Sequence, residues 1–275
     1  MKTYRHLFKY LKDKALWDRR ETLKIHKIAP ETRLASSLSA VEIFVTLYYG
    51  KIIKFYPKKI NRQSRDRFII SKGHGAISLY PILADLGFFP KKYLANACKT
   101  GSILGTIPDT IIPGFETTNG SLGHGLGVGC GMALALKRKK RTEKVFVLIG
   151  DGELYEGSVW EAIMFASEHK LDNLILILDD NKACMLDYCK NIIDINPISE
   201  KFKIFDWKVK VVNGHSVAQL FIALNSFKND NCGKPKVLIA DTIKGKGVCR
   251  LETDSLCHIR SLSAEEADNI IAGLR

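Results

Sequence analysis

The sequence has 275 residues, of which 46% are hydrophobic and 26% charged, and its formal net charge is +13. This length allows one large domain or two small ones. The chain has enough apolar residues to bury a sizeable core, which excludes an intrinsically disordered protein. No repeat of 3, 7 or 20–50 residues stands out, so a collagen-like or coiled-coil protein is also excluded.

The excess positive charge is concentrated in residues 1–67, which contain 17 lysines and arginines against 6 acidic residues. A basic end of this kind is typical of nucleic-acid binders and of proteins with acidic partners. Here the charges alternate with apolar residues at near-helical spacing, and no nucleic-acid-binding motif accompanies them. We therefore expect a solvated helical surface, in a helical N-terminal extension over residues 1–35, and no nucleic-acid partner.

The seven cysteines are spaced irregularly and include no CxxC pair, which favours reduced thiols over disulfides or a metal site. The charged N-terminus lacks the apolar stretch of a signal peptide. Residues 117–136 carry no charge and are long enough to span a membrane, but six of them are glycines. We expect a buried glycine-rich loop that leads into a helix, no membrane partner and a cytoplasmic location.

The predicted elements begin with a helix over residues 39–49, for which Ser39 is a plausible N-cap and Glu42 completes a capping box. A short strand (68–70) and a helix (76–86) follow. Further along, buried strands (145–149, 174–178, 209–212, 237–240) alternate with helices (157–169, 217–224). Continuous apolar strands in this order predict an α/β fold. We expect a single domain, residues 36–275, with a mainly parallel sheet flanked by helices.

Polar residues follow two neighbouring strands of this sheet: Gly-Asp-Gly at 150–152 and Asp-Asp-Asn at 179–181. Ligands of open α/β sheets bind at the carboxyl ends of the strands, so Asp151 and Asn181 should converge. Carboxylate, amide and carbonyl oxygens suit Mg²⁺ or Ca²⁺, and Gly152 leaves room for a diphosphate beside the ion. Gly-Asp-Gly alone is also a common turn sequence.

Gly-Asp-Gly followed by Asn181 resembles the thiamine-diphosphate-binding motif. Four parts of the sequence resemble the transketolase family in sequence and order: SKGHGAISLY (71–80), ETTNGSLGHGLGVGCGMALALK (116–137), GDGELYEGSVWEA…KLDNLILILDDN (150–181), and KGKGV (244–248) followed by His258. The resemblance covers roughly residues 36–275 and implies the thiamine-diphosphate-binding fold. It also implies transfer of a two-carbon ketol unit from a ketose donor to an aldehyde acceptor, with thiamine diphosphate and Mg²⁺ (or Ca²⁺) as cofactors.

The resemblance also implies roles for individual residues. The metal ligands would be the side chains of Asp151 and Asn181 and the carbonyl of Ala183. Catalytic roles would fall to His74 and His258, which face cofactor and substrate, and to Glu156, which lies at a subunit interface in the family. Residues that contact the cofactor would be His74, Gly120, Ser121, Leu122, Gly150, Gly152, Glu153, Asn181, Lys244 and His258.

Two positions depart from the family pattern. Arg33 and Ile107 stand where the family has histidines that contact sugar hydroxyls or help to move protons. Arginine can bind an anion with two hydrogen bonds, and isoleucine makes a pocket less polar. We therefore expect a non-standard sugar substrate, for which a nucleotide-linked or deoxy sugar of surface-polysaccharide assembly is a candidate. A degenerate site that binds the cofactor but turns over poorly is the competing interpretation.

In the family, a glutamate that ionises the cofactor belongs to a second, pyrimidine-binding domain. The sequence ends soon after His258, where the family's first domain ends. We therefore expect the N-terminal subunit of a split transketolase, active only with a C-terminal partner subunit that supplies this glutamate, in an α₂β₂ assembly. A cofactor-binding subunit with little or no turnover, or another thiamine-dependent carbon–carbon lyase or ligase, remains the alternative.

Overall fold

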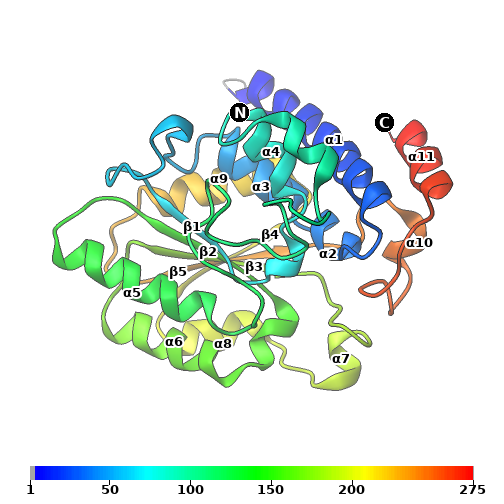
Figure 1. Ribbon diagram of the computed structural model, residues 1–275. Coiled ribbons are helices and arrows are strands. Elements are labelled where there is room, and N and C mark those ends of the chain that lie inside the picture. The colour runs from blue at the N-terminus through cyan, green and yellow to red at the C-terminus, as the bar shows by residue number, and fades with distance from the viewer. Residues whose placement is uncertain (1–3, 275) are drawn as a thin grey trace.

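The computed structural model describes residues 4–274 and shows a five-stranded sheet between two layers of helices (Figure 1). All the strand pairs are parallel, in the order β1-β2-β3-β5-β4. The sequence prediction of an α/β fold with a mainly parallel sheet is confirmed. The strands are β1 (Arg67–Ile70), β2 (Val145–Gly150), β3 (Leu174–Asp180), β4 (Lys208–Asn213) and β5 (Lys236–Asp241).

The helices alternate with these strands along most of the chain. Those before β2 are α1 (Arg5–Ile28), α2 (Leu34–Leu38), α3 (Val41–Tyr48), α4 (Leu79–Asp85) and α5 (Gly125–Arg138). Those after β2 are α6 (Gly157–Glu168), α7 (Cys189–Ile192), α8 (Ile198–Ile204), α9 (Val217–Lys228), α10 (Cys249–Glu252) and α11 (Ala264–Gly273).

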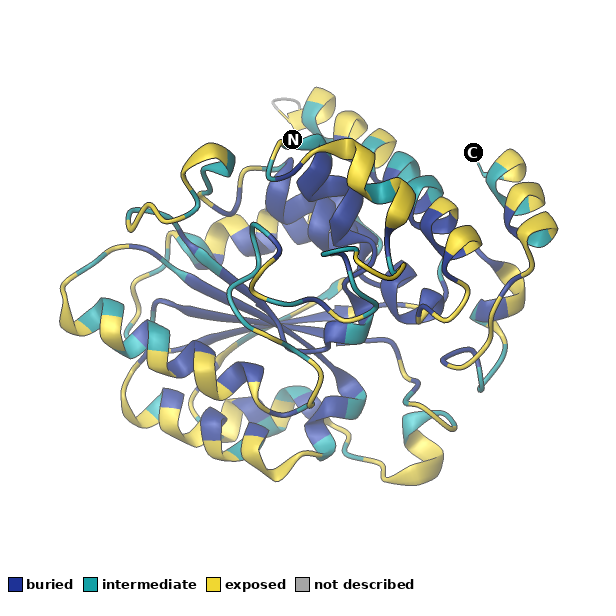
Figure 2. Cartoon of the chain, viewed as in Figure 1, coloured by how far each residue is buried: buried dark blue, intermediate teal, exposed yellow. Residues whose placement is uncertain are grey.

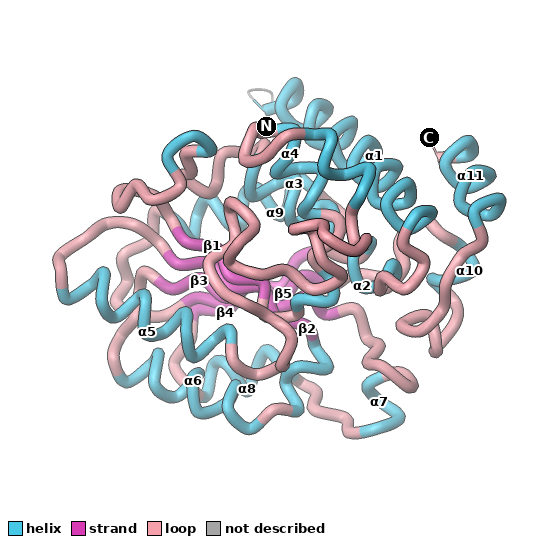
Figure 3. Tube along the Cα trace, viewed as in Figure 1, coloured by secondary structure: helices cyan, strands magenta, loops and turns pink. Residues whose placement is uncertain are grey.

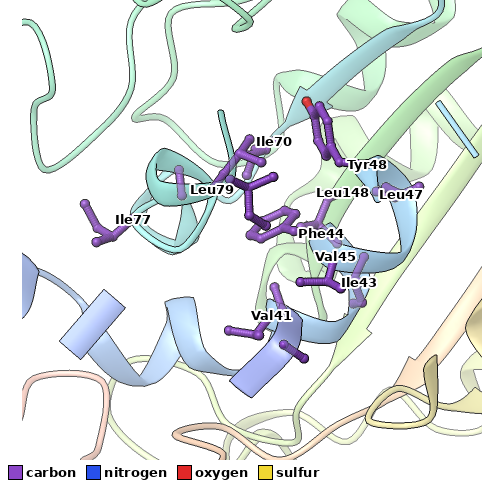
Figure 4. Close-up of a cluster of buried hydrophobic side chains, with 14 of the residues drawn as sticks. Val41, Ile43, Phe44, Val45, Leu47, Tyr48, Ile70, Ile77, Leu79 and Leu148 are labelled. Atoms are coloured by element: carbon purple, nitrogen blue, oxygen red, sulfur yellow. The ribbon is translucent and has the colours of Figure 1, made fainter. Parts of the chain in front are cut away.

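Alternate residues of the central strands face the two helical layers, because successive side chains of a strand point to opposite faces. Leu148 and Ile177 pack in a cluster with α1, α3, α4 and α9, whereas Val147 and Leu176 pack with α5, α6 and α8. Figure 4 shows part of the first cluster, with Phe44 of α3 beside Leu148. Both faces of the central strands β2 and β3 are therefore buried, as Figure 2 also shows, whereas the edge strand β4 is partly exposed.

Helix α1 lies in the segment for which a helical N-terminal extension was predicted, and it packs against α3 and α11. Its apolar face, including Leu11, Leu23 and Ile25, is part of the larger core cluster. Residues 1–3 of the predicted extension lie outside the described residues. The boundary at residue 35 remains a prediction.

Three local predictions were wrong. Helix α3 is capped by Ala40 without a side-chain hydrogen bond; the Ser39 hydroxyl donates instead to Asp179, at 2.6 Å. The helix predicted over 76–86 begins at Leu79, after a single 3₁₀ turn over Gly73–Gly75. The glycine-rich loop leads into α5 as expected, but it lies at the surface, where Gly120 is exposed.

The cysteines at positions 98, 130, 184, 189, 232, 249 and 257 are free thiols.

Within residues 4–274, no helix combines the length and the apolar character that a membrane crossing requires.

Candidate active site

Asp151 and Asn181 follow neighbouring strands at the carboxyl edge of the sheet. Gly150 of β2 lies opposite Asp179 of β3 in the strand register, so the two following turns are adjacent. The Asp151 carboxylate accepts a hydrogen bond from the backbone N–H of Lys182, in the turn that contains Asn181. The sequence therefore predicted correctly that these two turns meet.

Both residues line a cavity of about 410 Å³, within the size range of small-molecule sites. The loop between β3 and α7, whose course Figure 3 shows, contributes Asn181 and residues 183–186 to the lining of this cavity. Eleven residues predicted from the sequence line it: His74, Gly120, Leu122, Gly150, Asp151, Gly152, Glu153, Asn181, Ala183, Lys244 and His258. The rest of the lining was not predicted: Ser36, Lys72, Tyr155, Cys184, Met185, Leu186 and Ile192.

Four predicted site residues lie outside this lining. Ser121 is exposed, and Glu156 is exposed at the start of α6. Arg33 is exposed immediately before α2, and its charge helps to lower the pKa of His258. Ile107 is 42% exposed and lies against Gly73: a Cβ added to Gly73 would be 3.3 Å from Cγ2 of Ile107. The two positions that depart from the family pattern thus lie near the cavity.

The two predicted histidines meet in the cavity. Their rings, from His74 and His258, lie edge to face with centroids 5.1 Å apart, and the Ser36 hydroxyl is 3.3 Å from His258 Nδ1. Burial, followed by the positive charges of Lys72 and Lys244, lowers the pKa of His74 well below its ordinary value. Burial and Lys244 also lower the pKa of His258, to about 3. Both rings are therefore neutral at pH 7.

Lys72 is a buried residue of the site that the prediction missed. Its ammonium forms an ion pair with Asp179, whose carboxylate also accepts hydrogen bonds from the hydroxyls of Ser39 and Thr242. Burial would raise the pKa of Asp179, but Lys72 and these hydrogen bonds hold it below its ordinary value. The signal was present in the sequence, because Lys72 belongs to the SKGH segment together with His74.

Glu153 holds the glycine-rich loop against the sheet. Its carboxylate accepts a hydrogen bond from the backbone N–H of Gly123, at 2.9 Å, and one from the Ser71 hydroxyl. The same hydroxyl accepts a hydrogen bond from the N–H of Gly125 at the start of α5, at 3.0 Å. Gly120 has φ +139°, and no atom lies within 4 Å of the point where a Cβ would stand, so its backbone is open to close approach by a ligand.

Lys244 connects the last strand to the turn after β3. Its ammonium donates hydrogen bonds to the carbonyl oxygens of Ala183, at 2.8 Å, and Cys184, at 2.9 Å. Burial lowers the pKa of Lys244, although the carboxylate of Asp151 is one of the negative groups that oppose this shift. The ammonium group of Lys244 therefore places a positive charge beside the carbonyl oxygen of Ala183.

The oxygens at this point fit a hard divalent cation. Asp151 offers a carboxylate, Asn181 an amide oxygen and Ala183 a carbonyl, which are ligands that Mg²⁺ and Ca²⁺ prefer. Burial, together with the nearby Asp179 and Asp180, raises the pKa of Asp151 to about 7. In residues 4–274, no cluster of three or more His, Cys, Asp or Glu side chains could hold a metal. A cation here would complete its coordination with oxygens of the ligand.

The geometry agrees with a family match. Residues 32–273 match the family described as "Transketolase, thiamine diphosphate binding domain". The chain belongs to this transketolase family. It is 35% identical to one subunit of the apulose-4-phosphate transketolase of Actinobacillus succinogenes, over 100% of this chain and 99% of that protein. It is 36% identical to the 6-deoxy-6-sulfo-D-fructose transketolase subunit SqwG of Clostridium sp. (strain MSTE9), over 84% of each.

The solved structure of transketolase from Campylobacter jejuni has the same fold as this chain. The two superpose with a TM-score of 0.89 and 28% sequence identity, over 96% of this chain and 43% of the Campylobacter chain. The chain therefore spans less than half of the larger transketolases, but nearly the full length of the Actinobacillus relative, which is named as a transketolase subunit. This family of enzymes consists of transferases, and its members include forms divided into subunits.

Proposed function

We propose that this chain is the diphosphate-binding subunit of a split transketolase that transfers a two-carbon ketol unit from a ketose to an aldehyde. The observation that supports this most strongly is the convergence of Asp151, Asn181, Lys244 and two neutral histidines, His74 and His258, on one cavity. Membership of the transketolase family supports the same reaction.

The cavity fits thiamine diphosphate with Mg²⁺, or with Ca²⁺. Asp151, Asn181 and the carbonyl of Ala183 would hold the metal, and Gly120 and Leu122 would contact the pyrimidine side of the cofactor. When bound, the thiazolium ring of thiamine diphosphate serves as the electron sink of the reaction. The positive charge of Lys244 would favour the diphosphate, because an anion is stabilised by a buried ammonium group.

The histidines would act on the substrate. A neutral imidazole can donate one hydrogen bond and accept another, so His74 and His258 can orient sugar hydroxyls and accept a proton from them. Ser36, at 3.3 Å from His258 Nδ1, helps to fix the orientation of that ring. Glu156 has no place in the cavity lining, and its exposure at the start of α6 suits a role at a subunit interface.

A partner subunit would complete the site. Met185, Leu186 and Ile192 line the cavity although they are 53%, 61% and 46% exposed. Apolar side chains at the edge of a site favour contact with another surface. The relative from Actinobacillus is named as one subunit of its enzyme, which implies such a partner for that protein. We propose a C-terminal transketolase subunit, in an α₂β₂ assembly in the cytoplasm, where the free thiols would stay reduced.

The substrates would be sugars other than the common pentose and hexose phosphates. Arg33 adds a cation and Ile107 an apolar surface near the two histidines. Two relatives carry the names of unusual sugars, apulose-4-phosphate and 6-deoxy-6-sulfo-D-fructose. These observations favour a modified anionic or deoxy sugar, and a nucleotide-linked sugar of surface-polysaccharide assembly remains a candidate.

The proposal can be tested by purifying the chain together with the product of the adjacent open reading frame. The complex is screened with ketose donors and aldehyde acceptors in the presence of thiamine diphosphate and Mg²⁺. Ketol transfer that depends on both cofactors supports the proposal. Cofactor binding without turnover on any donor would support the alternative of a binding subunit, and cleavage without transfer would indicate another thiamine-dependent lyase.

A further inference from the structure

Two residues of the cavity lining, Lys244 and His258, come from the irregular segment that follows β5. This segment contains the short helix α10 but no strand of the sheet, so its position depends on contacts with other elements. Helix α1 packs against α11 of this segment, and two sets of polar contacts connect α1 to the segment's backbone.

The first contact connects α1 to the residue before Lys244. Arg19 donates to the Glu42 carboxylate at 2.6 Å, and Glu42 lies 3.0 Å from His215 Nδ1. The backbone N–H of Ile243 donates to His215 Nε2 at 2.8 Å. Nε2 must therefore be unprotonated, so the proton of the neutral ring is on Nδ1 and is donated to Glu42.

Arg19 also packs directly against the turn beyond Lys244. A Cβ added at Gly247, where φ is +91°, would lie 2.4 Å from Arg19 Cδ and 2.7 Å from its Nε. The backbone N–H of Gly245 donates to the carbonyl of Ala35 at 2.9 Å. The backbone before Lys244 is thus held by His215, and the backbone after it is held by Ala35 and Arg19 of the N-terminal part of the chain.

The second contact connects α1 to the segment that carries His258. The backbone N–H of Leu262 donates to His26 Nε2 at 3.0 Å, while His26 Nδ1 lies 2.7 Å from the Thr32 hydroxyl. His26 is fully buried near the end of α1. Its ring therefore joins the end of α1 to a backbone position four residues after His258.

We propose that α1 positions the cofactor-binding loop: His215, supported by Arg19 and Glu42, positions Lys244, and His26 positions His258. This inference rests on the proposed function, because it assigns Lys244 to the cofactor and His258 to the sugar. The proposal predicts separate effects on cofactor binding and on the use of sugar substrates. Loss of the contact to Ile243 should weaken cofactor binding, and loss of the contact to Leu262 should weaken the use of sugar substrates.

The test compares asparagine and glutamine at each histidine, in the complex with the partner subunit. Asparagine keeps a donor near Nδ1 but does not reach the backbone N–H, whereas the glutamine oxygen does. His215→Asn should raise the Kd for thiamine diphosphate about tenfold, and His26→Asn should lower kcat/KM for the sugar about tenfold at saturating cofactor. Both glutamine variants should remain within about threefold of the wild type.

The control is Lys27→Ala, which removes an exposed ion pair between α1 and α11, Lys27 to Asp268 at 2.6 Å. Cofactor binding is measured by calorimetry and thermal stability is recorded for every variant. If the asparagine variants lose thermal stability alone, or change both constants in the same way as Lys27→Ala, the positioning proposal is wrong. If the wild-type complex itself binds no thiamine diphosphate, the proposed function fails instead.

Discussion

The rings of His74 and His258 meet edge to face across the cavity, with centroids 5.1 Å apart, although 184 positions separate them in the sequence. His74 lies in the 3₁₀ turn after β1, and His258 lies beyond α10. The meeting of these two segments places two neutral imidazoles beside the residues that would hold the metal and the diphosphate.

Removal of either histidine should impair the chemical step. We expect His74→Ala and His258→Ala to lower kcat about 100-fold or more, because a positioned acid–base group typically contributes that much. Steady-state kinetics of the complex at saturating cofactor measures the effect. His169→Ala serves as the control, because His169 is exposed at the end of α6. Wild-type rates for both site variants would remove the histidines from the mechanism.

The predicted metal site depends on one carboxylate. We expect Asp151→Ala to weaken Mg²⁺-dependent binding of thiamine diphosphate at least about tenfold, since the cation would lose its charged protein ligand. Calorimetric titration with and without Mg²⁺ measures this change. The matched control is Asp241→Asn at the end of β5, where the side chain is 61% exposed. Equal affinities of wild type and Asp151→Ala would show that the metal binds elsewhere.

Asp18 of α1 should destabilise the fold. It is fully buried, and within residues 4–274 neither carboxylate oxygen has a hydrogen-bond partner. Burial raises its pKa well above the ordinary value, so the unfolded chain ionises at lower pH than the folded one. The free energy of unfolding therefore decreases as the pH rises from the pKa of Asp18 in the unfolded chain to its pKa in the folded chain. The decrease is about 1.4 kcal/mol for each pH unit between these two values.

The replacement Asp18→Leu should remove this cost. We expect it to raise the free energy of unfolding by about 2 kcal/mol at pH 8, since an unsatisfied buried polar group costs about 1–3 kcal/mol. The gain should shrink towards pH 4, close to the ordinary value of 3.8, where the carboxyl is protonated in the folded chain and only partly ionised in the unfolded one. Urea denaturation at the two pH values checks this. A gain that grows as the pH falls would contradict the assigned pKa shift.

His26 should make the fold sensitive to acid. Burial lowers the pKa of His26 from 6.5 to about 4. The unfolded chain binds a proton near pH 6.5 and the folded chain does not, so stability is complete above pH 6.5 and falls as the pH drops towards 4. At pH 5 the loss should be about 2 kcal/mol. Denaturation of the wild type and His26→Gln at pH 7 and pH 5 isolates this contribution; an unchanged difference between the two proteins would argue against it.

Arg33 and Ile107 should determine which sugars are used. The double substitution Arg33→His, Ile107→His restores the family's residues, and we expect it to shift the preference towards ordinary sugar phosphates by about tenfold in relative kcat/KM. The screen uses the same donors and acceptors for both proteins. An unchanged preference on every pair would remove these two residues from specificity.

The sheet and the core of the site were predictable because the signals are local. Strand periodicity and the turn after each strand located Asp151 and Asn181, and parallel pairing of β2 and β3 then brought them together. Most of the predicted residues that line the cavity lie within a few positions of these turns or of short motifs, so the order of the segments was enough to find them.

The missed features depend on contacts between distant segments. Glu42 has the spacing of a helix-capping residue, but it pairs with Arg19, 23 positions away, and with His215, 173 positions away. Ser39, the predicted N-cap, donates to Asp179 across 140 positions. An ionised buried carboxylate, such as that of Glu42 or Asp179, requires a charged or hydrogen-bonding partner, and that requirement overrides the small free energy of a helix cap.

The central claim is that this chain is one half of a transketolase active site. The most direct measurement is the rate of thiamine-dependent ketol transfer as the partner subunit is added to a fixed amount of this chain. We predict no transfer by either subunit alone and a rate that rises to a plateau at a 1:1 ratio. Transfer by this chain alone, at the rate of the mixture, would contradict the claim.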